Sequence, residues 1–246
     1  MAHGPDTERM LYRINELVKH PYKKTCYLNL MNLDITSLPK LPHGITHLNC
    51  NNTDIGLIKQ LPSTLVSLLC TGSGLREICA LPPFLKELRC DNNPGLRLLP
   101  DLPDSLDYLD CANCNLRELP LLPPNLTRLF CCYNPPLKSL PTLPNRLLEL
   151  DTTGIILQNL PPALTYLKTN MSVDADLPES LRFLVCLEGT FYIKDQVTKY
   201  NQDGDVIRSK RRCLERTALI KPDLIAALWD PQRIFIGINK GCKARG

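Results

Sequence analysis

The sequence has few of the residues and none of the motifs on which most enzymes depend. Among 246 residues it has 12 glycines, one tryptophan and 6% aromatic residues, and its four histidines all lie at or before His47. It has no glycine-rich phosphate loop and no serine-centred elbow motif. Cys213 lies beside Arg211 and Arg212, which favour a thiolate, but no histidine follows it to act as a base. We therefore expect a protein that is not an enzyme and that needs no cofactor.

Long apolar runs are also missing. No stretch reaches 18 consecutive apolar residues, so we expect no membrane span. The first residues lack the apolar core of a secretory signal, which favours an intracellular location. In that compartment the 12 cysteines stay reduced and do not form a disulfide framework.

Positive charge is scarce outside the C-terminal quarter. Residues 187–246 contain 12 Lys and Arg against 7 Asp and Glu, whereas the rest of the chain contains 17 against 18. A region without a positive field argues against nucleic-acid binding. The one basic cluster is interpreted as a solvated loop, with a nuclear signal or a nucleic-acid contact as the alternatives; it consists of Arg208, Lys210, Arg211 and Arg212.

Proline, by contrast, is abundant and periodic. Of the 22 prolines, 18 lie between Pro39 and Pro178. Leu-Pro pairs recur at intervals of 20, 20, 21, 20, 21, 17 and 17 residues, beginning at Leu41, Leu61, Leu81, Leu102, Leu122, Leu143, Leu160 and Leu177. Because proline fixes φ and removes a donor, these segments are expected to be extended or to form tight turns. A repeat of this period indicates a solenoid.

The copies follow the pattern L-x-x-L-x-C-x-x-N, as from Leu126 to Asn134, with Thr152 and Thr169 in place of the cysteine in two copies. The alternation within L-x-C has the period of a strand, so each copy should add one short parallel strand to a sheet. Its leucines would form one buried column, made of Leu48, Leu68, Leu88, Leu109, Leu129 and Leu150. Its cysteines would form the next, made of Cys50, Cys70, Cys90, Cys111 and Cys131.

The pattern resembles the leucine-rich-repeat family over residues 25–187. The Leu-Pro pairs are similar to the short repeats of secreted bacterial effectors of the IpaH and YopM kind. Strings such as Cys90-Asp91-Asn92-Asn93 are similar to leucine-rich-repeat proteins of large DNA viruses. The resemblance implies a curved, mostly β, α/β repeat solenoid of eight or nine repeats, with parallel strands on the concave face and a proline-rich extended convex side.

The cysteine column allows two interpretations. A metal or redox site is one, and a ladder of small, buried, inert thiols is the favoured one. Cys111-x-x-Cys114 looks like half a zinc site, but no second pair completes a tetrahedral set. In register, Cys114 is equivalent to Thr53, Ser73, Asn93 and Asn134, whose side chains the family uses to satisfy backbone groups after the strand. We therefore expect no metal.

The ends of the chain are expected to cover the solenoid. Residues 1–24 contain an amphipathic helix over 6–20, with Asp6 or Thr7 as its cap and an apolar face made of Met10, Leu11, Ile14, Leu17 and Val18. An open solenoid end needs covering, which favours a capping helix over a partner-binding or membrane-surface helix. Residues 188–246 form a C-terminal cap or small basic module, with irregular strands and a short helix from Pro222.

Side chains beside the buried columns should point to solvent on the concave face. Their mixture of aromatic and charged groups is typical of protein recognition. In the middle of the array this set, which we call the concave face, consists of Glu87, Arg89, Asp91, Tyr108, Asp110, Arg128, Phe130, Glu149, Asp151, Tyr166 and Lys168.

The sequence therefore predicts a non-enzymatic protein-binding module, acting as a host-directed effector or adaptor in the host cytoplasm. One alternative is the substrate-recognition component of a ubiquitin-ligase assembly. The other is a structural or virion-associated protein. The partner and the oligomeric state are left open by the sequence.

Overall fold

The computed structural model describes residues 4–19, 26–155, 157, 159–169, 177–186 and 190–193. The chain divides into two compact units, Met1–Gly189 and Thr190–Gly246. In the second unit the described element is strand β12 (Thr190–Ile193). The basic cluster at 208–212 and the helix expected from Pro222 lie outside the described residues, and the domain boundaries drawn from the sequence stay predictions.

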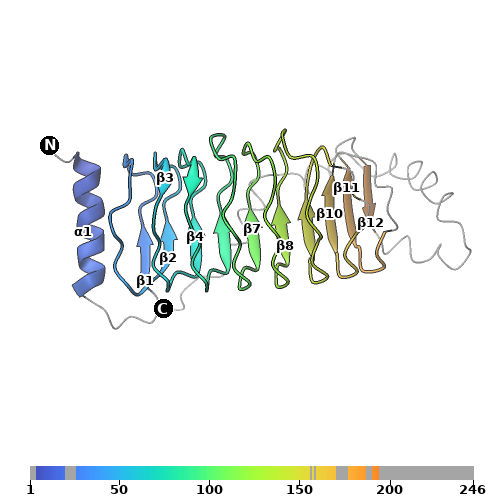
Figure 1. Cartoon of the computed structure of the whole chain (residues 1–246), viewed down its shortest axis with the longest axis horizontal. Coiled ribbons are helices and arrows are strands. Elements are labelled where there is room, and N and C mark those ends of the chain that lie inside the picture. The colour runs from blue at the N-terminus through green and yellow to red at the C-terminus, as the bar shows by residue number, and fades with distance from the viewer. Residues whose placement is uncertain are drawn as a thin grey trace, which may run out of the picture. The chain divides into compact units, whose positions relative to one another are not determined.

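The first unit is a solenoid built on one parallel sheet, as the sequence predicts (Figure 1). Each repeat contributes one short strand, and each strand pairs with that of the next repeat. In sheet order the strands are β1 (Cys26–Asn29), β2 (Ile45–Asn49), β4 (Ser67–Leu69), β6 (Glu87–Arg89), β7 (Tyr108–Asp110), β8 (Arg128–Phe130), β9 (Glu149–Asp151), β10 (Tyr166–Thr169) and β11 (Phe183–Cys186).

The leucine column predicted from the repeat is confirmed. The central leucines of consecutive strands are direct register partners from Leu48 to Leu150. Each is at most 1% exposed. Full burial of one leucine side chain contributes about 1.5–3 kcal/mol, so this column is a principal source of stability for the array.

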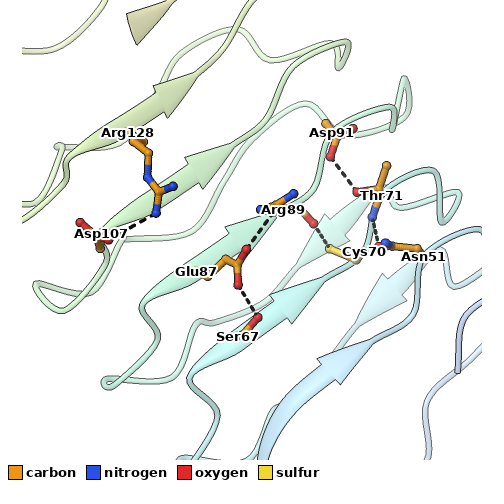
Figure 2. Close-up of polar contacts among 9 residues, drawn as sticks. All are labelled: Asn51, Ser67, Cys70, Thr71, Glu87, Arg89, Asp91, Asp107 and Arg128. Atoms are coloured by element: carbon orange, nitrogen blue, oxygen red, sulfur yellow. Dashed lines mark hydrogen bonds and ion pairs between the residues drawn. The ribbon is translucent and has the colours of Figure 1, made fainter. Parts of the chain in front are cut away.

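The cysteine column is also buried, and it marks the end of each strand. The backbone N–H of Cys70 donates to the carbonyl of Arg89, and that of Cys90 donates to the carbonyl of Asp110, both at 2.8 Å. The Cys70 thiol bonds the same Arg89 carbonyl at 3.2 Å (Figure 2). A small side chain fits here because the next repeat lies directly against it.

The Leu-Pro pairs form the turn that enters each strand. The proline carbonyl accepts a hydrogen bond from the N–H of the leucine three residues later, as from Leu85 to Pro82 at 3.2 Å and from Leu126 to Pro123 at 3.1 Å. This is the i to i+3 bond of a β-turn. The proline-rich segments therefore include the tight turns that the sequence predicts.

The turn that leaves each strand uses a left-handed residue. The second residue after the column cysteine has a positive φ in successive repeats: Asn52 (54°), Gly72 (59°), Asn92 (58°), Asn113 (51°) and Tyr133 (56°). Glycine and asparagine tolerate this conformation, which explains the Asn-rich strings of the sequence. Tyr133 has no such tolerance, and its N–H donates to the Thr153 hydroxyl at 2.7 Å.

A buried ladder closes each of these turns. The Asn93 amide donates to the carbonyls of Cys70 and Cys90, both at 2.9 Å, and its oxygen accepts from the N–H groups of Ser73 and Leu75. Cys114 takes the equivalent place, and its thiol bonds the Cys90 carbonyl at 3.2 Å. The assignment of Cys114 to this ladder is therefore confirmed.

The convex side is mostly irregular. Two early repeats form a small parallel pair there, β3 (Leu57–Ile58) with β5 (Glu77–Ile78). Where the repeat shortens to 17 residues, a hollow of about 670 Å³ opens between two successive convex segments; its lining includes Lys138, Leu140, Leu143, Ile155 and Leu160.

Helix α1 (Pro5–Lys19) packs at the β1 end of the solenoid (Figure 1). Met10 and Ile14 are buried, as expected from its apolar face, whereas Leu11 and Val18 are exposed. The predicted cap is wrong: the helix begins at Pro5, and the Gly4 carbonyl accepts the N–H of Thr7. The Asp6 carboxylate is used elsewhere, because it accepts the N–H of Asp34 at 2.9 Å.

Candidate functional site

The concave face is arranged in two columns by the sheet register. Each column takes one residue from each strand between β6 and β10, on either side of the buried leucines. The first column is Glu87, Tyr108, Arg128, Glu149 and Tyr166; the second is Arg89, Asp110, Phe130, Asp151 and Lys168. Asp91 follows the end of β6. The structure thus brings the whole set predicted from the sequence together, while its role in binding stays a prediction.

An aromatic cluster occupies the centre of this face. The rings of Tyr108 and Phe130 lie 5.5 Å apart at an interplanar angle of 33°. The guanidinium carbons of Arg89 and Arg128 each lie 4.6 Å from the centroid of the Tyr108 ring. Cation–π contacts of this kind hold the ring and both guanidiniums in place. We call these four residues the aromatic cluster.

Both arginines are also ion-paired. Arg89 Nε lies 2.8 Å from Glu87 Oε1, and the other oxygen of Glu87 accepts the Ser67 hydroxyl at 2.8 Å (Figure 2). Arg128 Nη2 lies 3.7 Å from Asp107 Oδ2. These side chains are partly exposed, so each pair contributes about 0–1 kcal/mol, and its main effect is on orientation.

Asp107 was missed by the sequence reasoning. It lies directly before β7 (Tyr108–Asp110), so the alternation of buried and exposed side chains along that strand does not assign it to the concave face. Its carboxylate accepts the Thr127 hydroxyl at 2.5 Å in addition to the Arg128 pair. The sequence does contain a hint of this contact. Asp107 and Thr127 occupy the same position in successive repeats, where a carboxylate and a hydroxyl lie close enough to form a hydrogen bond.

Asp151 is not the exposed contact that the alternation predicts. Its side chain is 9% exposed, and Oδ2 pairs with Lys168 Nζ at 2.7 Å. Among the described residues, Oδ1 has no hydrogen-bond partner. Burial is the largest single effect and opposes the charge on Lys168, but the hydrogen bond to Asp151 and the negative charge of that carboxylate together raise the pKa of the lysine. The pair therefore serves to fix the second column.

Asp110 carries an unusual carboxyl group. Burial, followed by the nearby charge of Asp91, raises its pKa to about 7. The N–H of Ala112 bonds its carboxylate at 3.2 Å and acts in the opposite direction. A carboxyl group that titrates near neutrality makes the charge of this face sensitive to pH.

The cysteines of the buried column lack the features of reactive thiols. Burial raises the pKa of the Cys50 and Cys131 thiols to about 12, and it raises the pKa of Cys90 well above its usual value. Thiols in this state are poor nucleophiles. The nine cysteines from Cys26 to Cys132 are all free. Within the described part of the chain, no group of three His, Cys, Asp or Glu residues is placed to hold a metal ion.

Among the residues that the structure describes, no helix combines the length and apolar character that crossing a bilayer requires.

Solved structures similar to this chain include two forms of YopM. YopM from Yersinia enterocolitica matches with 33% identity and a TM-score of 0.66, over 76% of this chain and 42% of its own length. YopM from Yersinia pestis, described as a leucine-rich effector protein, matches with 28% identity and a TM-score of 0.56, over 74% of this chain and 65% of its own. The chain thus spans less than two thirds of either protein.

A third similar structure is the leucine-rich-repeat domain of a Shigella effector, with 28% identity and a TM-score of 0.48 over 74% of this chain and 73% of its own. No model of a known protein family matches the chain, and a search of curated proteins finds no significant match.

Proposed function

Because the chain is a leucine-rich-repeat protein with repeats of the bacterial-effector type, we propose that it is a non-enzymatic recognition module that binds another protein through its concave face. The observation that carries this proposal is the aromatic cluster. Tyr108 and Phe130 are only half buried, and they lie at the centre of a face that is otherwise charged. No packing task within the array accounts for apolar side chains at this place.

The composition of the cluster supports recognition. Tyrosine and arginine are over-represented among residues that dominate binding energy, and they act best at the centre of an interface. The two guanidiniums are already held against the Tyr108 ring. A partner therefore meets side chains with little remaining freedom, which reduces the entropy lost on binding.

The size of the face also fits. Five strands, β6 to β10, carry the two columns, and neighbouring strands lie about 4.8 Å apart, which gives a length of about 20 Å. A standard interface covers about 800 Å² on each partner, and such a patch provides its centre. As a host-directed effector, the protein would act inside the host cell, where its thiols stay reduced.

The test is affinity capture from a lysate of eukaryotic host cells with three forms of the full chain. The first is the unchanged protein, and the second carries Tyr108→Ala with Phe130→Ala. The third is a matched control with Leu98→Ser and Leu121→Ser, which removes two exposed apolar side chains elsewhere on the solenoid. We expect one protein to be captured by the first and third forms and lost from the second.

Equal capture by all three forms would contradict the use of the concave face. Ligase subunits that remain bound to the second form would favour the ubiquitin-ligase alternative. The absence of any captured protein would favour a structural role.

A further inference from the structure

The charges of the concave face do not balance. Its members include five carboxylates and three cationic side chains. The carboxylates are Glu87, Asp91, Asp110, Glu149 and Asp151; the cations are Arg89, Arg128 and Lys168. The chain as a whole carries a net charge of +4, so the acidic excess is a local property of this face.

Pairing within the protein increases this imbalance. Arg89 is paired with Glu87, Arg128 with Asp107 and Lys168 with Asp151, so each cation of the face already has a carboxylate. Asp91, Asp110 and Glu149 have no cationic partner within ion-pair distance among the described residues. We call these three the free carboxylates.

The free carboxylates are held in place by neutral groups. The Thr71 hydroxyl donates to Asp91 at 2.7 Å, and the N–H of Ala112 donates to Asp110 at 3.2 Å (Figure 2 shows the first of these bonds). Such bonds orient a carboxylate without cancelling its charge, although the pKa of Asp110, raised to about 7 by burial, means that this group is fully charged only above neutral pH. Asp91 and Asp110 also repel each other, since the charge of Asp91 raises the pKa of Asp110.

Asp151 adds a further source of negative potential. One of its oxygens pairs with Lys168, while the other is buried and has no hydrogen-bond partner among the described residues. Its charge is a further cause of the raised pKa of Asp110. The five carboxylates of the face thus outnumber its three cations, and each of these cations is already paired with a carboxylate of the protein.

The aromatic cluster lies within the same surface. Phe130 lies between Asp110 and Asp151 in the second column, and Tyr108 lies between Glu87 and Arg128 in the first. Lysine and arginine side chains have long apolar stems that pack on such rings while their charged ends reach a carboxylate. The combination of rings and free carboxylates suits a basic side chain better than an acidic one.

From this charge complementarity we propose that the partner presents a basic protein segment to the concave face, with lysine or arginine side chains directed to Asp91, Asp110 and Glu149. This inference rests on the proposed function, because it assumes that this face is the one that binds. An acidic segment or a nucleic acid would need the three cations to leave their carboxylates, and it would meet the free carboxylates as like charges.

The test uses a displayed library of random 16-residue peptides, with the full chain as bait at low salt. Peptides selected by the unchanged protein should contain at least twice the Lys and Arg content of the unselected library. A synthetic copy of the most enriched peptide is then measured against a neutral variant that combines Asp91→Asn, Asp110→Asn and Glu149→Gln. We expect the affinity to fall at least 10-fold, because the ion pairs are lost while side-chain size is kept.

A second variant separates this inference from the proposed function. If the selected peptides lack basic residues but lose binding to Tyr108→Ala with Phe130→Ala, the concave face binds and the basic partner is wrong. If the peptides bind both variants as they bind the unchanged protein, the inference and the proposed function are both wrong. Failure to enrich any peptide, or enrichment of acidic peptides, would also overturn the inference. A melting temperature of the neutral variant that is no lower than that of the unchanged protein shows that its effect is on binding and not on folding.

Discussion

The ring of Phe130 lies 5.5 Å from the ring of Tyr108, its neighbour on the preceding strand, and both rings remain half exposed. They belong to different columns of the sheet, so they meet diagonally across two repeats. Replacing both by alanine should lower the free energy of unfolding by no more than about 1–2 kcal/mol, because neither ring is part of the buried core. Urea unfolding measures this. A loss of folding would show that the cluster is structural.

The buried cysteine column should not tolerate charge. Cys90→Asp places a carboxylate where the side chain is fully buried, and we expect a loss of at least about 3 kcal/mol in the free energy of unfolding. The matched control is Cys79→Asp on an exposed thiol, which should change stability by less than about 0.5 kcal/mol. Similar urea midpoints for the two variants would mean that the strand register is wrong.

The ladder after each strand makes a second stability prediction. Asn93→Ala removes the partner of three carbonyls and two N–H groups in a buried turn, which should cost about 2–4 kcal/mol. Cys114→Asn places the residue type of Asn93 and Asn134 at the equivalent position, and it should leave the thermal midpoint within a few degrees of the unchanged protein. A Cys114→Asn variant as unstable as Asn93→Ala would contradict the shared role of these positions.

In the turns that leave strands β2 to β8, the residue with positive φ is glycine or asparagine except in one repeat, where it is Tyr133. Tyr133→Asn should raise the free energy of unfolding by roughly 1 kcal/mol, because it relieves the steric cost of a positive φ on an exposed side chain. Differential scanning calorimetry should show a higher melting temperature. A lower one would indicate that the tyrosine ring makes a contact worth more than the strain.

Stability should depend on pH through Asp110. Its pKa is about 7 in the folded protein and near the usual 3.8 in the unfolded chain, so the folded state binds more protons between these values. Stability should therefore fall as pH rises from about 4 to about 7. Asp110→Asn, which mimics the protonated form, should be more stable than the unchanged protein at pH 8 by roughly 1–2 kcal/mol, after discounting for partial exposure.

The two proteins should have similar stability below about pH 3, where Asp110 is largely neutral in both the folded and the unfolded state. The control is Asp101→Asn on an exposed carboxylate. Its difference in stability from the unchanged protein should not change with pH. A constant difference between Asp110→Asn and the unchanged protein from pH 4 to pH 8 would be inconsistent with the raised pKa.

Much of the fold could be predicted from the repeat, because each position recurs in an equivalent environment. The period alone places Leu88 and Cys90 in buried columns and assigns Cys114 to the ladder of Asn93. The strand alternation also places Arg89 and Phe130 on one face. These predictions depend on spacing along the chain, which the sequence shows directly.

The remaining features depend on side-chain directions between repeats. Alternation predicts the same exposure for Asp110 and Asp151, yet Lys168 covers Asp151, while Asp110 remains half exposed. The stacking of Arg89 and Arg128 on Tyr108 requires rotamers that no sequence pattern specifies. Likewise, Asp6 suits a helix cap by residue type, but a neighbouring turn provides the stronger partner at Asp34.

Site-specific photo-crosslinking tests the central claim most directly. A benzophenone amino acid is placed at Phe130 in one protein and at Leu121, an exposed convex position, in another, and each is irradiated in host-cell lysate. If the concave face is the binding surface, one specific protein should be crosslinked from position 130 and none from position 121. A specific adduct from position 121 alone would contradict it.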